Sequence, residues 1–174
     1  MTRRTLLKAG IAGGALLLLA RALRAPAAAA ASPGAGESAL DSDARTVLAA
    51  VIPVVLEGAL PTEPGAAQSR DEALAGAARV IAGLPPSARR ELDQLFALLA
   101  FAPTRAIVAG VWSPWPEASR ESIAAFLVRW RDSRFSLLRS AYDALHQIIL
   151  GAWYGNERAW PAIGYAGPPA LSLE

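Results

Sequence analysis

The sequence predicts an all-α protein, an irregular bundle of about five or six helices followed by an extended tail rich in Pro, Gly and aromatic residues. Apolar residues recur at helical spacing in several segments, and no segment sustains the period of two that a strand requires. Prolines and glycines separate these segments. With 174 residues, of which 53% are hydrophobic and 18% charged, the chain can bury the core of one or two domains.

Residues 1–31 have the layout of an export signal. Its positively charged N-terminal part contains Arg3 and Arg4, followed by Leu6, Leu7 and Lys8. About ten apolar residues follow at 11–20, and Arg21 ends the run well short of the ~20 residues that a membrane span needs. The paired arginines and moderate hydrophobicity predict a twin-arginine (Tat) signal, which exports folded cargo, with cleavage near Ala29 or Ala31. A Sec signal and a retained membrane anchor are the alternatives.

The charge is divided unevenly along the chain. Residues 1–31 hold five basic residues and no acid, whereas the remaining 143 hold 12 arginines, no lysine and 15 acidic residues. The body is therefore slightly acidic, although the whole chain has a net charge of +2. Because it offers no basic stripe to neutralise phosphates, we expect no nucleic-acid partner.

The sequence contains few residues of the types that usually catalyse reactions or bind metals and cofactors. Cysteine is absent and His146 is the single histidine, which argues against disulfides, thiol catalysis, iron–sulfur clusters and ordinary zinc sites. His146 lies in a helical pattern and is expected to be a hydrogen-bonded interior or rim residue. Residues 34–39 match the letters G-x-G-x-x-A, but a linker precedes them where the dinucleotide fingerprint needs a strand. We expect no catalytic residue, cofactor or metal in this chain, so its signal for folded cargo is best explained by a partner.

After a linker at 32–40, the helical domain is expected at 41–154. The run Asp41-Ser42-Asp43 supplies an N-cap for a first helix with one buried face at 47–56, and Pro53 kinks or ends part of it. A loop follows at 58–65. Residues 70–82 form a weak helix, because its stripe consists mostly of alanine.

Prolines divide the second half of the domain. A helix with an apolar repeat at 92–99 ends at Pro103, two further turns occupy 104–111, and the prolines in 112–116 require a loop. The strictest helical stripe lies at 123–130. The chain then breaks near Asp132 and Ser133, and a long last helix reaches Trp153. The pairs Asp71/Glu72 and Glu117/Glu121 lie at helix starts, where the helix dipole favours acids, so they receive no catalytic role.

Residues 155–174 form a tail in which glycines and prolines exclude a continuous helix. Aromatic side chains on such a stiff frame are typical of protein interfaces, although the tail could also pack on its own helices. The candidate partner-binding residues are Trp112, Trp115, Trp153, Tyr154, Trp160, Ile163, Gly164, Tyr165, Gly167, Pro168 and Pro169.

Four features together resemble one known family. They are the Tat-type leader, the run L-A-A-V-I-P at 48–53, Trp130 and Ser133 leading into L-R-S-A-Y at 138–142, and W-P-A-I-G-Y-A-G-P-P at 160–169. The chain resembles the small (gamma) subunit of bacterial membrane-associated gluconate and sugar dehydrogenases, the gluconate 2-dehydrogenase subunit 3 family. Some members of that family contain cysteines, which this sequence lacks.

The resemblance implies an accessory subunit without its own active site. In that family the catalytic subunit is a flavoprotein of the glucose-methanol-choline (GMC) type that contains FAD and lacks an export signal. The small subunit's leader carries it through the Tat translocase by a hitchhiker mechanism. A multi-haem cytochrome c subunit commonly passes the electrons onward to quinone. The expected location is therefore the periplasm, with membrane association through the complex.

Two other functions are consistent with the residues. A stand-alone periplasmic helical protein would bind a ligand or serve a structural role, with the Trp112/Trp115 loop and the tail lining a pocket. An enzyme would have to use only Asp, Glu, Arg and Tyr side chains, and the sequence shows no recognisable nucleophile constellation for it.

Overall fold

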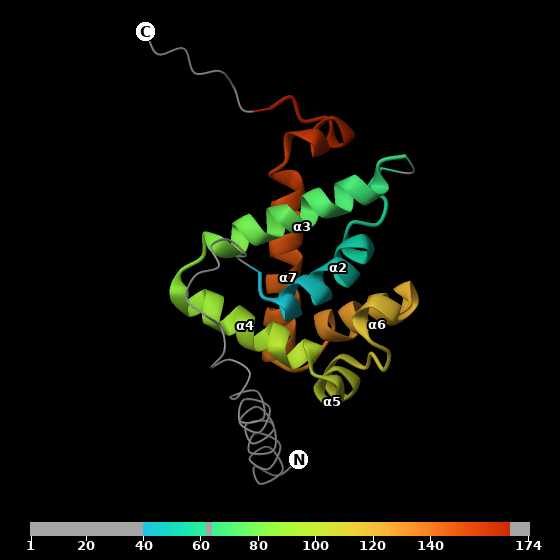
Figure 1. Cartoon of the computed structure of the whole chain (residues 1–174), viewed down its shortest axis with the longest axis vertical. Coiled ribbons are helices and arrows are strands. Elements are labelled where there is room, and N and C mark those ends of the chain that lie inside the picture. Colours follow the sequence, from blue (N-terminus) through green and yellow to red (C-terminus); the bar gives the residue numbers. More distant parts are fainter. Residues whose placement is uncertain (1–39, 62–63, 168–174) are drawn as a thin grey trace. The chain divides into compact units, whose positions relative to one another are not determined.

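The computed structural model describes residues 40–61 and 64–167, and all regular elements in that part are helical, which confirms the predicted all-α bundle. The main helices are α2 (Ser42–Val55), α3 (Ala66–Ala82), α4 (Pro86–Ala100), α6 (Arg120–Arg131) and α7 (Ser136–Tyr154) (Figure 1). The shorter elements are α5 (Ala102–Thr104), the π-helix η1 (Arg105–Ala109), and the 3-10 turns η2 (Trp115–Glu117), η3 (Glu157–Ala159) and η4 (Pro161–Ile163). The predicted export signal, Pro168 and Pro169 lie outside the described residues.

Helix α2 packs against α3, α4, α6 and α7 and supplies the central part of the core. Val47, Leu48, Val51 and Ile52 are buried, as the predicted face requires. Pro53 does not end the helix, which continues to Val55. A proline removes one helical hydrogen bond at this point, and the extensive burial of the preceding turns compensates for that loss.

Helix α3 crosses α7 at close range, and its alanine-rich stripe makes this approach possible (Figure 1). Ala73, Gly76 and Ala77 are buried against the neighbouring helices. A Cβ added at Gly76 would lie 3.0 Å from the Cβ of Ala152 in α7. The small residues therefore select close packing of two backbones, which compensates for the little apolar area that each alanine buries.

The start of α3 differs from the prediction, because the helix begins at Ala66 and not near residue 70. Ala66 and Ala67 have the highest intrinsic helix propensity. One turn later, Nε2 of Gln68 donates a hydrogen bond to Oε1 of Glu72 over 2.9 Å. Such i, i+4 pairs support the first turns of a helix.

The segment after α4 also differs from the prediction. Helix α4 ends at Ala100, and Pro103 is the second residue of α5. A proline is tolerated there because the first-turn N–H groups have no helical acceptor. The predicted turns at 104–111 are mainly the π-helix η1, which ends at Gly110 in a left-handed conformation with φ of 64°.

The last two helices follow the predicted pattern. Ile123, Phe126, Leu127 and Trp130 are the buried residues of α6. The chain breaks at Asp132, which caps α6, and α7 then extends for 19 residues. In the described part of the C-terminal tail no continuous helix forms, as its glycines and prolines predict, but the short 3-10 turns η3 and η4 interrupt the extended course.

Candidate interaction surfaces

The first candidate surface is the loop at 110–116, here called the Trp112 loop, which joins η1 to α6. Trp112 is 81% exposed on it. The carbonyl groups at the end of η1 have no hydrogen-bond donors within their own helix. Side chains of α6 supply these donors instead. Nε1 of Trp130 donates to the carbonyl oxygen of Val108 over 3.0 Å, and Nη1 of Arg129 donates to that of Ala109 over 2.7 Å. The base of the loop is thus fixed by tertiary hydrogen bonds.

Further contacts fix both ends of the Trp112 loop. Nε of the buried Arg105 donates to the carbonyl oxygen of Val111 over 3.3 Å, and the Val111 N–H returns a bond of the same length to the Arg105 carbonyl. At Gly110 an added Cβ would lie 2.8 Å from Cζ of Arg129. Glycine suits this position, because a larger residue would need a left-handed backbone and would also displace the guanidinium that covers it.

The structure corrects the assignment of Trp115 and Trp153 to a partner-binding surface. Trp115 is 2% exposed, lies edge-on to Phe126 with 5.7 Å between ring centroids, and donates from Nε1 to the carbonyl oxygen of Leu99 over 2.9 Å. Trp153 is buried in α7. Both side chains have complete surroundings within their own chain, and their indole areas stabilise its core.

The second candidate surface is the end of the chain, at 155–167, here called the Trp160 hook. The Nε1 of Trp160 donates to the carbonyl oxygen of Tyr154 over 2.9 Å, and its carbonyl oxygen accepts from the Tyr165 N–H over 3.0 Å. The rings of Trp160 and Tyr165 meet edge-on with 5.1 Å between centroids. The segment therefore folds back around the half-buried Trp160.

Two glycines of the motif allow this fold. Gly164 has φ of 69°, which reverses the chain after η4 and returns Tyr165 to Trp160. Gly167 has φ of 98°, and an added Cβ there would lie 3.1 Å from Cζ3 of Trp160. With Trp160 engaged inside the hook, Ile163 remains 53% exposed and Tyr165 47% exposed, and Tyr154 is also exposed at the end of α7.

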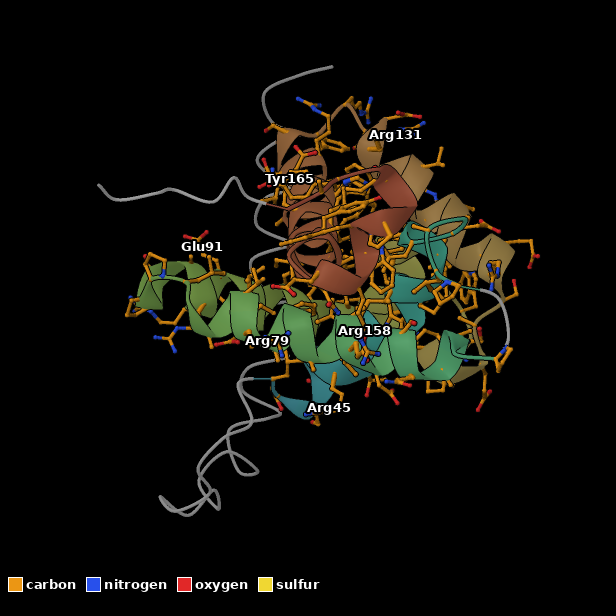
Figure 2. The ribbon with its side chains drawn as sticks, turned by 90° about the horizontal axis from the view of Figure 1, so that it is seen from above. Arg45, Arg79, Glu91, Arg131, Arg158 and Tyr165 are labelled. Atoms are coloured by element: carbon orange, nitrogen blue, oxygen red, sulfur yellow. The ribbon has the colours of Figure 1, made fainter. Side chains whose placement is uncertain are left out.

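Glu72 of α3 anchors the hook. Its Oε1 accepts a hydrogen bond from Nη1 of Arg158 over 2.8 Å, and its Oε2 accepts one from Nδ2 of Asn156 over 3.4 Å. Arg158 lies over α3 in the view from above (Figure 2). In the sequence, Glu72 is distinguished only by its position near a helix start; its partners Asn156 and Arg158 lie more than 80 residues away, which periodicity does not reveal.

Other exposed apolar side chains were not predicted. Leu137, near the start of α7, is 77% exposed, and Phe135 and Ile107 are exposed as well. The guanidinium of Arg134 lies 4.9 Å from the centroid of the Phe135 ring. One signal was available in the sequence: Leu137 lies outside the buried stripe of its own helix, which contains Leu145, Ile148 and Ile149.

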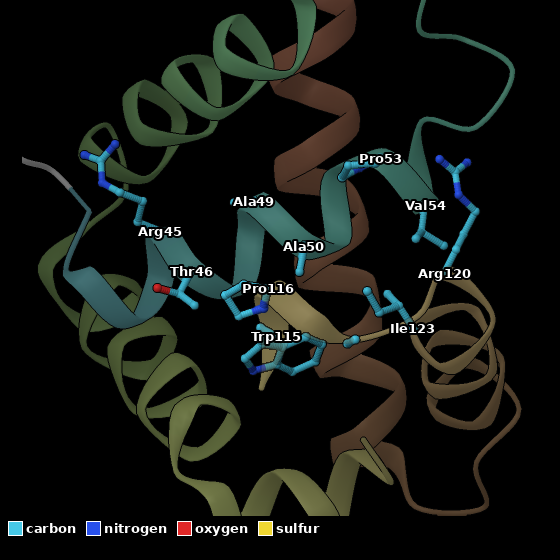
Figure 3. Close-up of a pocket in the computed structure, with 11 residues that line it drawn as sticks. Arg45, Thr46, Ala49, Ala50, Pro53, Val54, Trp115, Pro116, Arg120 and Ile123 are labelled. Carbon is cyan, nitrogen blue, oxygen red and sulfur yellow. The ribbon is translucent and has the colours of Figure 1, made fainter. Parts of the chain in front are cut away.

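A shallow groove of about 450 Å³ lies between α2 and the segment 115–123. Small and apolar residues of α2 form one side, and Trp115, Pro116 and Ile123 form the other (Figure 3). Two polar side-chain groups of its lining are already bonded to the backbone of their own chain, because Oγ1 of Thr46 donates to the Ser42 carbonyl and Nε1 of Trp115 donates to that of Leu99. The groove is therefore suited to apolar groups.

Titratable side chains in the described part are scattered. The ring of His146 stacks on that of Tyr142, with 5.3 Å between centroids. The pKa of Glu121 is lowered by a hydrogen bond to its own backbone and by the Ser119 hydroxyl, which also caps α6. At the other end of α6, hydrogen bonding to Arg131 lowers the pKa of Asp132. No group of three or more acidic or histidine side chains is placed to hold a metal ion within the described residues.

No protein-family model matches the chain, and no curated protein or solved structure matches it either. The family resemblance of the leader and tail motifs therefore stays a prediction. In the part that the structure describes, no single helix is long and apolar enough to span a membrane. The pair Pro86–Ala100 and Ala102–Ala109 meets the length and composition limits only when taken together, and it is bent by 82°.

Proposed function

We propose that the chain is the non-catalytic small subunit of a periplasmic, FAD-dependent sugar or alcohol dehydrogenase of the GMC type. Its leader, with Arg3 and Arg4, exports the folded flavoprotein together with this chain. Its helical body holds and stabilises the flavoprotein through the Trp112 loop and the Trp160 hook. In this assignment FAD belongs to the partner, and a multi-haem cytochrome c subunit completes the complex.

The exposure of Trp112 on a loop with a rigid base is the observation that best supports docking to a partner. A tryptophan that is 81% exposed leaves a large apolar area in water, although the loop beneath it is held by hydrogen bonds from Arg129 and Trp130. A prepositioned aromatic side chain loses little conformational entropy when a partner covers it, which is the usual property of an interface hot spot. Ile163 and Tyr165 of the hook likewise expose apolar area, 53% and 47% of their surfaces.

The binding test uses a GMC-type flavoprotein subunit, which the proposal expects to be encoded beside this chain, co-produced without a leader of its own. Trp112→Ser and Tyr165→Ser are each expected to weaken the complex by at least about tenfold in Kd, the effect of losing roughly 1.4 kcal/mol at a hot spot. Leu137→Ser is the control, because Leu137 is equally apolar and 77% exposed but lies outside both surfaces. Equal losses in all three variants would contradict the assignment of these surfaces.

The export test concerns the leader alone. Replacing Arg3 and Arg4 by lysines should leave the dehydrogenase activity in the cytoplasm, because the flavoprotein has no signal of its own in this proposal. Fractionation of periplasm and cytoplasm measures it. Unchanged periplasmic activity would contradict hitchhiker export.

A stand-alone ligand-binding protein is the second candidate, favoured by the groove of about 450 Å³, a volume within the range of small-molecule sites. Such sites normally place a few convergent polar groups, whereas Thr46 and Trp115 direct theirs to the backbone of their own chain. Production of the chain by itself separates the two functions. A stable monomer favours the stand-alone protein, and aggregation relieved by the flavoprotein favours the accessory subunit.

A further inference from the structure

Helix α2 is apolar on all sides after its first turn, which contains the charged residues Asp43 and Arg45. From Thr46 to Leu56 the sequence contains no charged residue, and Thr46 is the single polar one. One face, with Val47, Leu48, Val51 and Ile52, is buried in the core. A helix whose second face met only water would normally carry charged or polar residues there, and helices that are hydrophobic all round are covered on all sides.

The second face of α2 forms the floor of the groove. Thr46, Ala49, Ala50, Pro53 and Val54 follow one another at the i, i+3, i+4, i+7, i+8 spacing of a single helical stripe, and all of them line it. Their short side chains allow a second backbone to approach α2 closely. The opposite wall is firm, because Trp115 is a core residue, 2% exposed, that is fixed by its hydrogen bond to the Leu99 carbonyl oxygen; it supports the groove and is not itself a partner-binding residue.

Pro53 adds one polar feature to this floor. A proline has no N–H, so the carbonyl group of Ala49, four residues earlier, lacks its normal helical donor. Ala49 is exposed and lies in the stripe that faces the groove (Figure 3). An occupant whose backbone N–H reaches this carbonyl would supply the donor that Pro53 lacks.

The charged residues of the groove are both basic. Arg45 and Arg120 lie at its opposite ends, and its lining contains no acidic residue (Figure 3). Arg120 forms an exposed ion pair with Glu57 over 3.3 Å, whereas Arg45 has no ion-pair partner among the described residues. The groove therefore complements an apolar occupant that carries a carboxylate, above all at the Arg45 end.

We propose that this groove docks a polypeptide segment of the partner flavoprotein, with two or three small or medium apolar side chains against α2 and an acidic residue beside Arg45. The inference rests on the proposed function and adds a third contact surface to it. It explains in one step why α2 carries no charge after Arg45, why the groove lacks convergent polar side chains, and why its ends are basic.

The test measures the affinity of the full chain for the co-produced, FAD-loaded flavoprotein. Ala49→Arg places a long charged side chain in the groove and should raise Kd at least about tenfold. Ala82→Arg is the matched control, because Ala82 is exposed on α3 and outside the groove. Arg45→Glu should also weaken binding, with a loss that shrinks as salt is added, whereas Arg89→Glu on the exposed side of α4 should not. Circular dichroism shows that each variant is folded.

The outcomes separate this inference from the proposed function. Unchanged affinity of folded Ala49→Arg, together with weaker binding of Trp112→Ser, overturns the groove as a docking site and leaves the accessory role intact. If the unaltered chain forms no complex with the flavoprotein, both the groove as a docking site and the proposed function are wrong. If Ala49→Arg instead abolishes self-association in sedimentation and leaves flavoprotein binding unchanged, a second copy of this chain is the occupant and the inference is wrong.

A photo-crosslinking amino acid at position 50 identifies the occupant directly. Within the co-purified complex it should attach to one flavoprotein segment, whose sequence contains an acidic residue within about four positions of the attachment point. Attachment to a segment without such a residue, or to this chain's own residues, contradicts the proposed chemistry. The same amino acid at position 82 serves as the control.

Discussion

The Trp112 loop and the Trp160 hook present aromatic side chains in two different ways. The loop depends on distant residues, since Arg129 and Trp130 of α6 donate to carbonyl groups about 20 positions earlier in the chain. The hook depends mainly on near neighbours, because Trp160 bonds to Tyr154 and Tyr165, five or six positions away. Its contacts with the rest of the bundle include Glu72, a partly exposed anchor, and the side chain of Ala159, which is buried in the core.

This difference sets the stability expected of each surface. The loop shares its contacts with the core, so it should unfold only when the bundle unfolds. The hook has few long-range contacts among the described residues and should open locally at a lower free energy. A partner can therefore dock first on the preformed loop and then fix the hook, whose ordering would be completed in the complex.

The largest effect is expected within the loop, where two tryptophans lie three positions apart. Trp115→Ala removes a buried indole and its hydrogen bond, and should lower the free energy of unfolding by about 3–5 kcal/mol. Trp112→Ala should change it by no more than about 0.5 kcal/mol, because that side chain is in water. Urea unfolding followed by circular dichroism measures both. Equal losses would mean that Trp112 belongs to the core.

An intermediate effect comes from the two left-handed glycines, which form a matched pair. Gly110 and Gly164 have φ of 64° and 69°. Gly110→Ala adds a clash with the Arg129 guanidinium to the backbone strain, and should cost about 2–3 kcal/mol of global stability. At Gly164 no other described atom lies within 4 Å of an added Cβ. Gly164→Ala should therefore destabilise the hook and leave the stability of the bundle unchanged.

The measurement for this pair combines urea unfolding with hydrogen exchange. Gly164→Ala should shift the global unfolding free energy by less than about 0.5 kcal/mol while it speeds exchange of the Trp160 indole N–H. A global loss as large as that of Gly110→Ala would show that the hook is part of the cooperative core.

The smallest effect is expected at the anchor of the hook. Glu72→Ala removes the acceptor for Arg158 and Asn156, and should lower global stability by less than about 1 kcal/mol because the ion pair is largely exposed. Limited proteolysis after position 155 should nevertheless become faster. Asp71→Ala is the control, since this neighbouring acid is exposed and forms no salt bridge among the described residues. An unchanged rate of proteolysis in Glu72→Ala would show that contacts within the hook are sufficient to keep it folded.

The helices could be predicted because their signals are local. The stripe at 123–130 became the buried face of α6, and the break at Asp132 lies where the predicted helices were separated. The π-helix η1 could not be predicted in the same way. Its extra residue per turn is stabilised by hydrogen bonds from Arg129 and Trp130, and local spacing contains no information about those contacts.

The candidate surfaces were predicted only in part. Trp112 and Tyr165 are exposed as expected, whereas Trp115 and Trp153 are buried, although composition alone treats all of them as equivalent interface residues. The groove along α2 was missed, because a stripe of small and apolar residues resembles weak core until the opposite wall is known. The absence of charge between Thr46 and Leu56 was the signal available for it.

By itself, the sequence determined the all-α class, the order of the main helices, and the supply of aromatic side chains at 112–115 and 153–165. These properties follow from apolar periodicity and from the backbone limits of proline and glycine, which act over a few residues. Only the tertiary structure decided which tryptophans meet solvent and that α2 has a second apolar face along a groove. Burial depends on which elements meet in space, and two positions in one loop, Trp112 and Trp115, can therefore have opposite environments.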